Sequence, residues 1–192
     1  MMKTIFQEPP ENVDETWTHG AMLGGMCGYD EQEMAESYFA AGDTLISAVL
    51  DGQRDGRDMI NPVMYVYRHG IELYLKCIVQ PAVRDHNLAS LLEHFCRHVR
   101  ERYGEPIPRW ITKPISELAA YDRGSDTFRY ETDRDGRYFA TDGESWVDLP
   151  SVRKAMARLL FAFRRVWKTD QVGEILPVIA RRPIETFDDV PG

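Results

Sequence analysis

The sequence predicts an all-α protein, an up-and-down bundle of four to five helices with a small β-hairpin insertion. Four segments repeat apolar residues at steps of three and four, which is the spacing of one buried helix face. They lie at 30–50, 62–80, 87–103 and 150–169. The turn Asp133-Arg134-Asp135-Gly136 separates two short aromatic runs, and Asp-Gly is typical of hairpin turns because glycine accepts a positive φ.

Start and stop residues support each of these helices. Asp30, followed three residues later by a glutamate, forms a capping-box-like start to the first helix. Asn61 can cap the second helix, and Pro62 fits a first turn because no amide hydrogen is needed there. Asn87 can cap the third, which we expect to end at Gly104. The second helix is apolar nearly all round, which predicts a central position in the bundle.

The chain is expected to divide into three parts. Residues 1–28 form an N-terminal arm, because two prolines and four glycines there oppose a regular helix. Residues 29–169 form the bundle, including a shorter helix after Pro114. Residues 170–192 contain three prolines and form a C-terminal tail.

Composition excludes several classes of protein. The chain has 192 residues and a net charge of -8, which opposes indiscriminate nucleic-acid binding. No apolar run is long enough for a membrane span, and three widely spaced cysteines favour reduced thiols in the cytoplasm. The G-x-S-x-G, H-E-x-x-H, C-x-x-C and Walker patterns are absent, so nothing favours a serine hydrolase, a zinc protease or a nucleoside triphosphatase.

The second helix carries a group of charged residues on an otherwise apolar surface. Arg68, Glu72 and Lys76 follow each other by four and share one face, while His69 points about a quarter turn away. Such charges are costly to bury unless they are paired or line a cleft. They form either a salt-bridge ladder that orders the bundle or a polar pocket. In the second case Arg68, His69 and Glu72 are candidate catalytic residues.

His86 and Asn87 stand at the entrance to the third helix. Asn87 has a sufficient role as the helix cap, and we also count it and Lys76 as candidate binding residues. His86 can lie near Glu72, and a histidine beside a carboxylate can serve as a general base near neutral pH. His86 is therefore the fourth candidate catalytic residue.

We expect neither a metal nor a cofactor. His94 and His98 have the i, i+4 spacing of a metal-binding pair. No third ligand is evident, and the arginines at 97, 100 and 102 would repel a divalent cation.

The last helix carries a basic stripe. Its six positive charges, with no negative one between 153 and 168, leave -14 on the rest of the chain once they are subtracted from the net -8. The stripe is either a solvated helix face or a surface for RNA phosphates, an acidic partner or the protein's own acidic residues. These candidate binding residues are Arg153, Lys154, Arg158, Arg164, Arg165 and Lys168.

Three segments resemble bacterial proteins of the HEPN-like superfamily. The stretch YRHGIELYLK (67–76) is similar to their helix with an E-x-x-x-K pair. HNLASLL (86–92) is similar to the entry into their next long helix. DTFRY (126–130), followed by DRDG, resembles a segment of an uncharacterised subgroup, which makes Arg129 a candidate binding residue. The resemblance spans about residues 30–168.

The resemblance implies a helical bundle, often dimeric. Many relatives are RNA-cleaving toxins or modules of antiviral and toxin–antitoxin systems, and their nucleases use an R-x(4–6)-H motif. No arginine of this chain has a histidine five to seven residues later. His86 matches a loop position of the family and not the nuclease histidine. The expected function is therefore a non-catalytic, homodimeric binding or assembly module that engages RNA or a protein partner. The alternative is a divergent RNase of a toxin–antitoxin or antiviral defence system.

Overall fold

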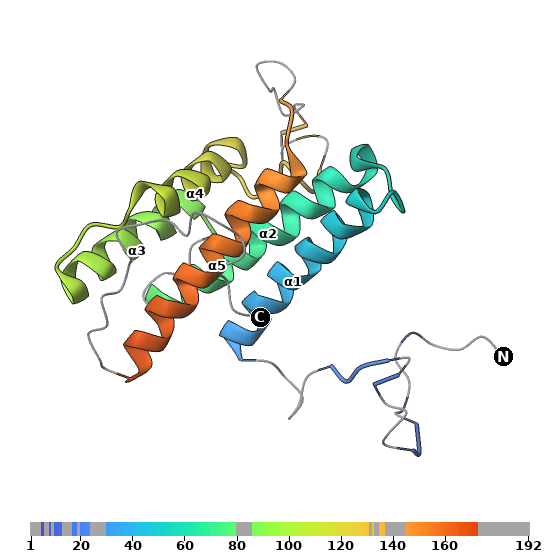
Figure 1. Ribbon diagram of the computed structural model, residues 1–192, viewed down its shortest axis with the longest axis horizontal. Coiled ribbons are helices and arrows are strands. Elements are labelled where there is room, and N and C mark those ends of the chain that lie inside the picture. Colours follow the sequence, from blue (N-terminus) through green and yellow to red (C-terminus); the bar gives the residue numbers. More distant parts are fainter. Residues whose placement is uncertain are drawn as a thin grey trace. The chain divides into compact units, whose positions relative to one another are not determined.

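Five α-helices make up the described bundle (Figure 1). They are α1 (Glu31–Leu50), α2 (Gly56–Val79), α3 (Leu88–Tyr103), α4 (Arg109–Tyr121) and α5 (Leu149–Val172). The computed structural model describes residues 5, 8, 10–12, 17–18, 20–23, 30–79, 86–130, 132, 135–136 and 145–172. The chain separates into two compact units, 1–30 and 31–192, and these helices belong to the second. The all-α class is thus confirmed, and no helix in the described ranges is both long and apolar enough to cross a membrane.

Helix α2 is the central element of the bundle. It packs against α1, α3 and α5, and it runs antiparallel to α1 after the short turn 51–55 (Figure 1). Nine of its residues are buried, and the side chains of Val63, Ile71 and Leu75 are fully enclosed. The prediction from its apolar circumference is therefore confirmed.

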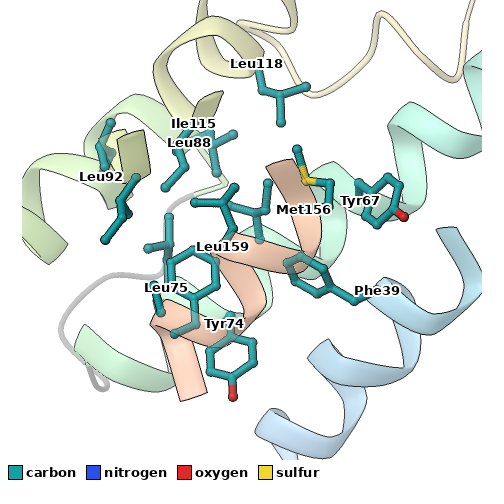
Figure 2. Close-up of a cluster of buried hydrophobic side chains, with 14 of the residues drawn as sticks. Phe39, Tyr67, Tyr74, Leu75, Leu88, Leu92, Ile115, Leu118, Met156 and Leu159 are labelled. Atoms are coloured by element: carbon teal, nitrogen blue, oxygen red, sulfur yellow. The ribbon is translucent and has the colours of Figure 1, made fainter. Parts of the chain in front are cut away.

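The core converges on Phe163 of α5. Its ring lies 5.2 Å from that of Tyr74, 5.7 Å from Phe95 and 6.4 Å from Phe39, measured between ring centroids. These partners come from α2, α3 and α1, so one aromatic side chain joins four helices. Figure 2 shows how the surrounding layer is filled by side chains of all five helices; those labelled are Phe39, Tyr67, Tyr74, Leu75, Leu88, Leu92, Ile115, Leu118, Met156 and Leu159.

A glycine permits the close approach of α1 and α2. A Cβ atom placed on Gly42 would lie 2.6–2.8 Å from three ring carbons of Tyr67. The Tyr67 ring therefore packs directly against the α1 backbone, and any side chain at Gly42 would force the two helices apart.

The caps of α3 agree with the sequence. The Asn87 side-chain oxygen accepts hydrogen bonds from the amides of Ala89 and Ser90, at 3.0 and 3.1 Å. Gly104 follows the helix with φ of 70°, and its amide donates to the carbonyl of Arg100. Both ends of α3 are thus satisfied as predicted.

Two helices begin earlier than predicted. Asp55 accepts the amide of Arg57 on its side chain and that of Met59 on its carbonyl, so α2 starts at Gly56 and Pro62 lies inside it. Helix α4 starts at Arg109, directly after a proline, and includes Pro114. In both cases the sequence predicts that the helix starts at a proline, whereas that proline lies inside the first turns of a helix that begins five or six residues earlier.

The predicted β-hairpin insertion is not supported. Its first arm forms turns, because the amides of Arg129 and Tyr130 both donate to the carbonyl of Asp126, at 3.0 and 2.9 Å. Those amides are then unavailable for pairing with a second strand. Gly136 has the positive φ of 73° that its turn position suggested, and 137–140, the second arm, lie outside the described residues.

The predicted boundaries of arm and tail fall largely outside what the structure describes. Residues 24–29, where the arm was expected to end, are not among the described residues. Helix α5 continues to Val172, three residues into the predicted tail, and 173–192 are also outside the described part.

Candidate functional site

Four of the predicted site residues meet on one side of α2. Arg68, Glu72 and Lys76 project from successive turns of the helix, and His86 reaches the same place from the segment before α3. Glu72 lies between the others: its two carboxylate oxygens are 2.7 Å from Arg68 Nη1, 2.8 Å from Lys76 Nζ and 2.7 Å from His86 Nδ1. The i, i+4 ladder of the sequence therefore exists, and a fourth residue joins it.

Arg68 is enclosed by the protein. Its side chain is only 2% exposed, although it is the largest fully buried side chain of the bundle. Besides Glu72, it donates from Nη2 to the backbone carbonyl of His86, at 3.0 Å. Its Nε lies 2.6 Å from Oδ2 of Asp122, an ion pair in which the N–H does not point at the oxygen. With these partners, the guanidinium is not positioned to hold a phosphate that arrives from solvent.

Asp122 is the member of this cluster that sequence reasoning missed. It follows the last residue of α4 and is as buried as Arg68. Its Oδ1 accepts the amide of Thr127 at 2.9 Å, so one carboxylate ties the exit of α4 to α2. A count of charges could have predicted a residue such as Asp122. Arg68 and Lys76 share a single carboxylate, that of Glu72, and a buried arginine needs a second carboxylate to balance its charge.

The Glu72–His86 pair has the geometry of an oriented base. Burial by itself raises the pKa of the Glu72 carboxyl, but hydrogen bonds from Lys76, Arg68 and His86 outweigh it and lower the pKa below its ordinary value. An ionised Glu72 accepts from Nδ1, which leaves Nε2 as the acceptor nitrogen of a neutral His86. The His86 side chain is 75% exposed, so this nitrogen can receive a proton from a bound molecule.

His69 is held apart from this hydrogen-bonded cluster. Its ring lies edge-on to Tyr38, with centroids 4.5 Å apart, and parallel to Tyr65 at 6.0 Å. Burial lowers the pKa of His69, and the positive charges of Arg68 and Lys76 act in the same direction against the opposing charge of Glu72. The ring is therefore a neutral, half-buried aromatic group at neutral pH.

The other two candidate binding residues outside α5 have local partners. Asn87 caps α3 through its side-chain oxygen. Arg129 donates to the carbonyl of Ser125 and to Asp126, and its guanidinium lies over the rings of Tyr130 and Tyr65, at 5.3 and 5.8 Å from their centroids. Arg129 thereby connects the loop after α4 to the surface of α2.

The basic stripe of α5 is largely engaged by the bundle itself. Arg153 pairs with Asp43, at 2.5 and 2.9 Å, and Arg164 pairs with Glu36, at 2.8 and 2.6 Å; both carboxylates belong to α1. Arg158 lies over the Trp110 ring at 4.8 Å, and Arg165 lies over that of Phe161 at 5.7 Å. The two exposed lysines of the stripe, Lys154 and Lys168, have no ion pair among the described residues. Among the interpretations that the sequence leaves open for the stripe, pairing with the protein's own acidic residues explains the contacts of Arg153 and Arg164.

His98 belongs to a second polar cluster and not to a histidine pair. Asp170 of α5 accepts from His98 Nε2 at 2.8 Å and from the Tyr103 hydroxyl at 2.5 Å, so the ends of α3 and α5 are joined. Burial and the neighbouring carboxylate raise the pKa of Tyr103. Within the described ranges, no three histidine, cysteine or carboxylate side chains are grouped as a metal would require.

Comparison of the chain with protein-family models, curated proteins and solved structures gives no match. The HEPN-like resemblance therefore stays a prediction from the sequence.

Proposed function

We propose that this chain is a non-catalytic, HEPN-like binding or assembly module that forms a homodimer in the cytoplasm and engages RNA or a protein partner. The observation that carries the proposal is the enclosure of Arg68, whose contacts to Glu72, Asp122 and the His86 carbonyl leave it no role at the surface. Phosphate-holding chemistry of the R-x(4–6)-H kind needs an accessible arginine. The buried charges are better explained as the frame that fixes α2, α4 and the segment before α3.

Exposed groups of the bundle support a binding role. Trp146 is 85% exposed just before α5, and a large ring of this kind is commonly covered by a partner. Lys154 and Lys168 extend from α5 on the same helix that carries the paired arginines. The exposed ring and the two lysines are surfaces that a second copy, a protein or an RNA can contact.

Two measurements test the proposal. Purified full-length protein is incubated with total RNA, which we expect to remain intact, and its mass is measured by light scattering, which should give a dimer. Degradation of the RNA that is lost in a His86→Ala variant would overturn the non-catalytic assignment. A monomer that binds neither RNA nor protein would overturn the module itself.

One observation favours the alternative, a divergent RNase of a toxin–antitoxin or defence system. Glu72 orients His86 so that Nε2 faces outward, and Lys76 Nζ lies 3.4 Å from Nδ1 of the same ring. This arrangement can accept the proton of a ribose 2′-hydroxyl beside a positive charge. Under this alternative, His86→Ala abolishes RNA cleavage and toxicity on expression, whereas His94→Ala on α3 leaves both unchanged.

A further inference from the structure

We propose that a strip of rings and cations along the partly exposed side of α2 binds a short segment of single-stranded RNA. The strip consists of Tyr65, His69 and Lys76 on α2, His86 before α3, and Arg129 after α4. The inference rests on the proposed function and specifies its partner and surface. The proposed RNA surface does not include the basic stripe of α5, which is the candidate surface for RNA phosphates in the sequence.

Helix geometry aligns the strip. Tyr65, His69 and Lys76 are separated by four and seven residues, so they project from the same side of α2. The rings of Tyr65 and His69 are parallel to within 4°, and the Arg129 guanidinium extends the row at 5.8 Å from the Tyr65 centroid. Between Tyr65 and Lys76 the helix rises about 16 Å, which is a length suited to a few nucleotides.

Cations stand at both ends of this row. Arg129 lies at the end formed by Tyr65, and Lys76 lies at the other end, beside the His86 ring. The His69 ring lies close enough to this second end for the charge of Lys76 to add to the effect of burial in lowering its pKa. The nearby carboxylates are engaged: Glu72 is buried under Lys76 and Arg68, and Asp126 pairs with Arg129 at 2.9 Å. On a chain of net charge -8, the strip is a place where an anionic backbone can approach.

The chemistry of the strip matches a single strand. Stacking on aromatic rings and contacts from cations to phosphates are the two elements of single-strand recognition. Bases of a duplex are already stacked and paired, and are therefore not available to Tyr65 and His69. RNA is favoured over DNA because the open Nε2 of His86 can accept a hydrogen bond from a 2′-hydroxyl, which DNA lacks.

The α5 stripe is a weaker candidate for the same ligand. Arg153 and Arg164 are each paired in two contacts with α1 carboxylates, whereas Arg129 and Lys76 each have one carboxylate partner for an RNA phosphate to replace. Its rings, Trp110 and Phe161, each lie under an arginine, as Tyr65 lies under Arg129. The α2 strip differs from the stripe in its two parallel rings in one row and in the exposed side chain of His86.

The test is fluorescence anisotropy of the full-length protein with a labelled oligouridylate, and with the DNA oligonucleotide of the same length. We expect wild-type protein to bind the RNA more tightly than the DNA. Tyr65→Leu should weaken RNA binding about tenfold, the loss of one stacked base. Lys76→Gln and Arg129→Gln should each weaken binding and lower the slope of log affinity against log salt by about 0.7.

Conservative variants and controls isolate the strip. Arg129→Lys should retain the salt slope but lose affinity, because it keeps the charge and removes the flat group that stacks. Arg97→Gln on α3 makes the same change of charge away from the strip and should bind like wild type. Urea midpoints equal to wild type establish that each variant is folded.

Three outcomes separate this inference from the proposed function. If wild-type protein binds RNA and Lys154→Gln or Lys168→Gln weakens binding while the strip variants do not, the strip is wrong and the module remains. If wild-type protein forms a dimer but binds no oligouridylate, the strip is overturned and the assembly role remains. If the protein cleaves the RNA and the strip variants still weaken its binding, the non-catalytic assignment fails and the strip is supported.

Discussion

Two sets of ion pairs in this bundle have similar distances and opposite surroundings. Arg68 meets Glu72 and Asp122 at 2.7 and 2.6 Å in the interior, where all three residues are about 2% exposed. Arg164 meets Glu36 at 2.6 Å on the surface between α5 and α1, with 54% of its side chain exposed. Water screens the second pair and not the first, so the same geometry has different energetic consequences.

The difference in burial distinguishes charges that stabilise the fold from charges that contribute little to it. Removing one member of the buried set leaves an uncompensated charge inside the bundle. Removing one member of the surface set exposes its partner to solvent at little cost. Arg68, Glu72 and Arg164 are all candidate site residues in the sequence, and only their burial shows that the first two belong to a structural frame.

The largest effect is expected for Arg68→Met. This variant leaves Glu72 and Asp122 without their shared cation and removes the donor to the His86 carbonyl, so stability should fall by about 3–5 kcal/mol. Urea denaturation measures the change as a lower midpoint at an unchanged slope. Arg164→Gln serves as the matched control, and an equally small loss in both variants would mean that the interior set is not desolvated as described.

Asp122→Asn should have the next largest effect. The amide oxygen still accepts from Thr127, while the charge opposite Arg68 is lost, so we expect a loss of about 2 kcal/mol. The same urea titration measures it. No change on this substitution would show that Glu72 alone compensates Arg68.

The Asn87 cap, an uncharged hydrogen-bonded contact beside the Arg68 cluster, should give a loss of stability between those of the buried and surface ion pairs. Asn87→Ala removes the oxygen that caps α3 and should cost about 1 kcal/mol, whereas Asn87→Ser should recover most of that loss. Thermal unfolding followed by circular dichroism can rank the two variants. A loss as large as that of Arg68→Met would indicate that Asn87 also supports the charged cluster.

The surface pair should respond weakly. Arg164→Gln is expected to cost less than about 1 kcal/mol, with a difference from wild type that shrinks in added salt. Stability measured at low and high ionic strength checks this. A loss that is large and independent of salt would place this pair with the buried set.

The smallest effect is expected from pH. Because the pKa of His69 is lower in the folded protein, the unfolded chain binds its proton more readily, and stability should fall as the pH drops below about 6.5. His69→Gln should make the stability curve flatter in that range. An unchanged curve would mean that the ring is no harder to protonate in the folded state.

Local sequence patterns predicted the helices well because each depends on neighbours in the chain. The apolar stripes, the Asn87 cap and the Gly104 stop all act within a few residues. The ladder from Arg68 to Lys76 was predictable for the same reason.

The contact of Asp122 was not predictable from the sequence, because Asp122 lies 54 residues beyond Arg68 and only the packing of α4 brings it to α2. The prediction of a strand at 127–130 was wrong because the amides of that segment donate to the carbonyl of Asp126 and the carboxylate of Asp122. An alternating sequence pattern does not reveal these competing acceptors.

A double-mutant cycle tests most directly whether the charged cluster is a buried frame. Arg68→Met and Asp122→Asn are made singly and together, and the free energies of unfolding are compared with those of the Arg164→Gln and Glu36→Gln cycle. We predict a coupling energy above about 1.5 kcal/mol for the interior pair and below about 0.5 kcal/mol for the surface pair. Equal and small coupling energies in the two cycles would contradict the account, because the Arg68 cluster would then be open to solvent and available for chemistry.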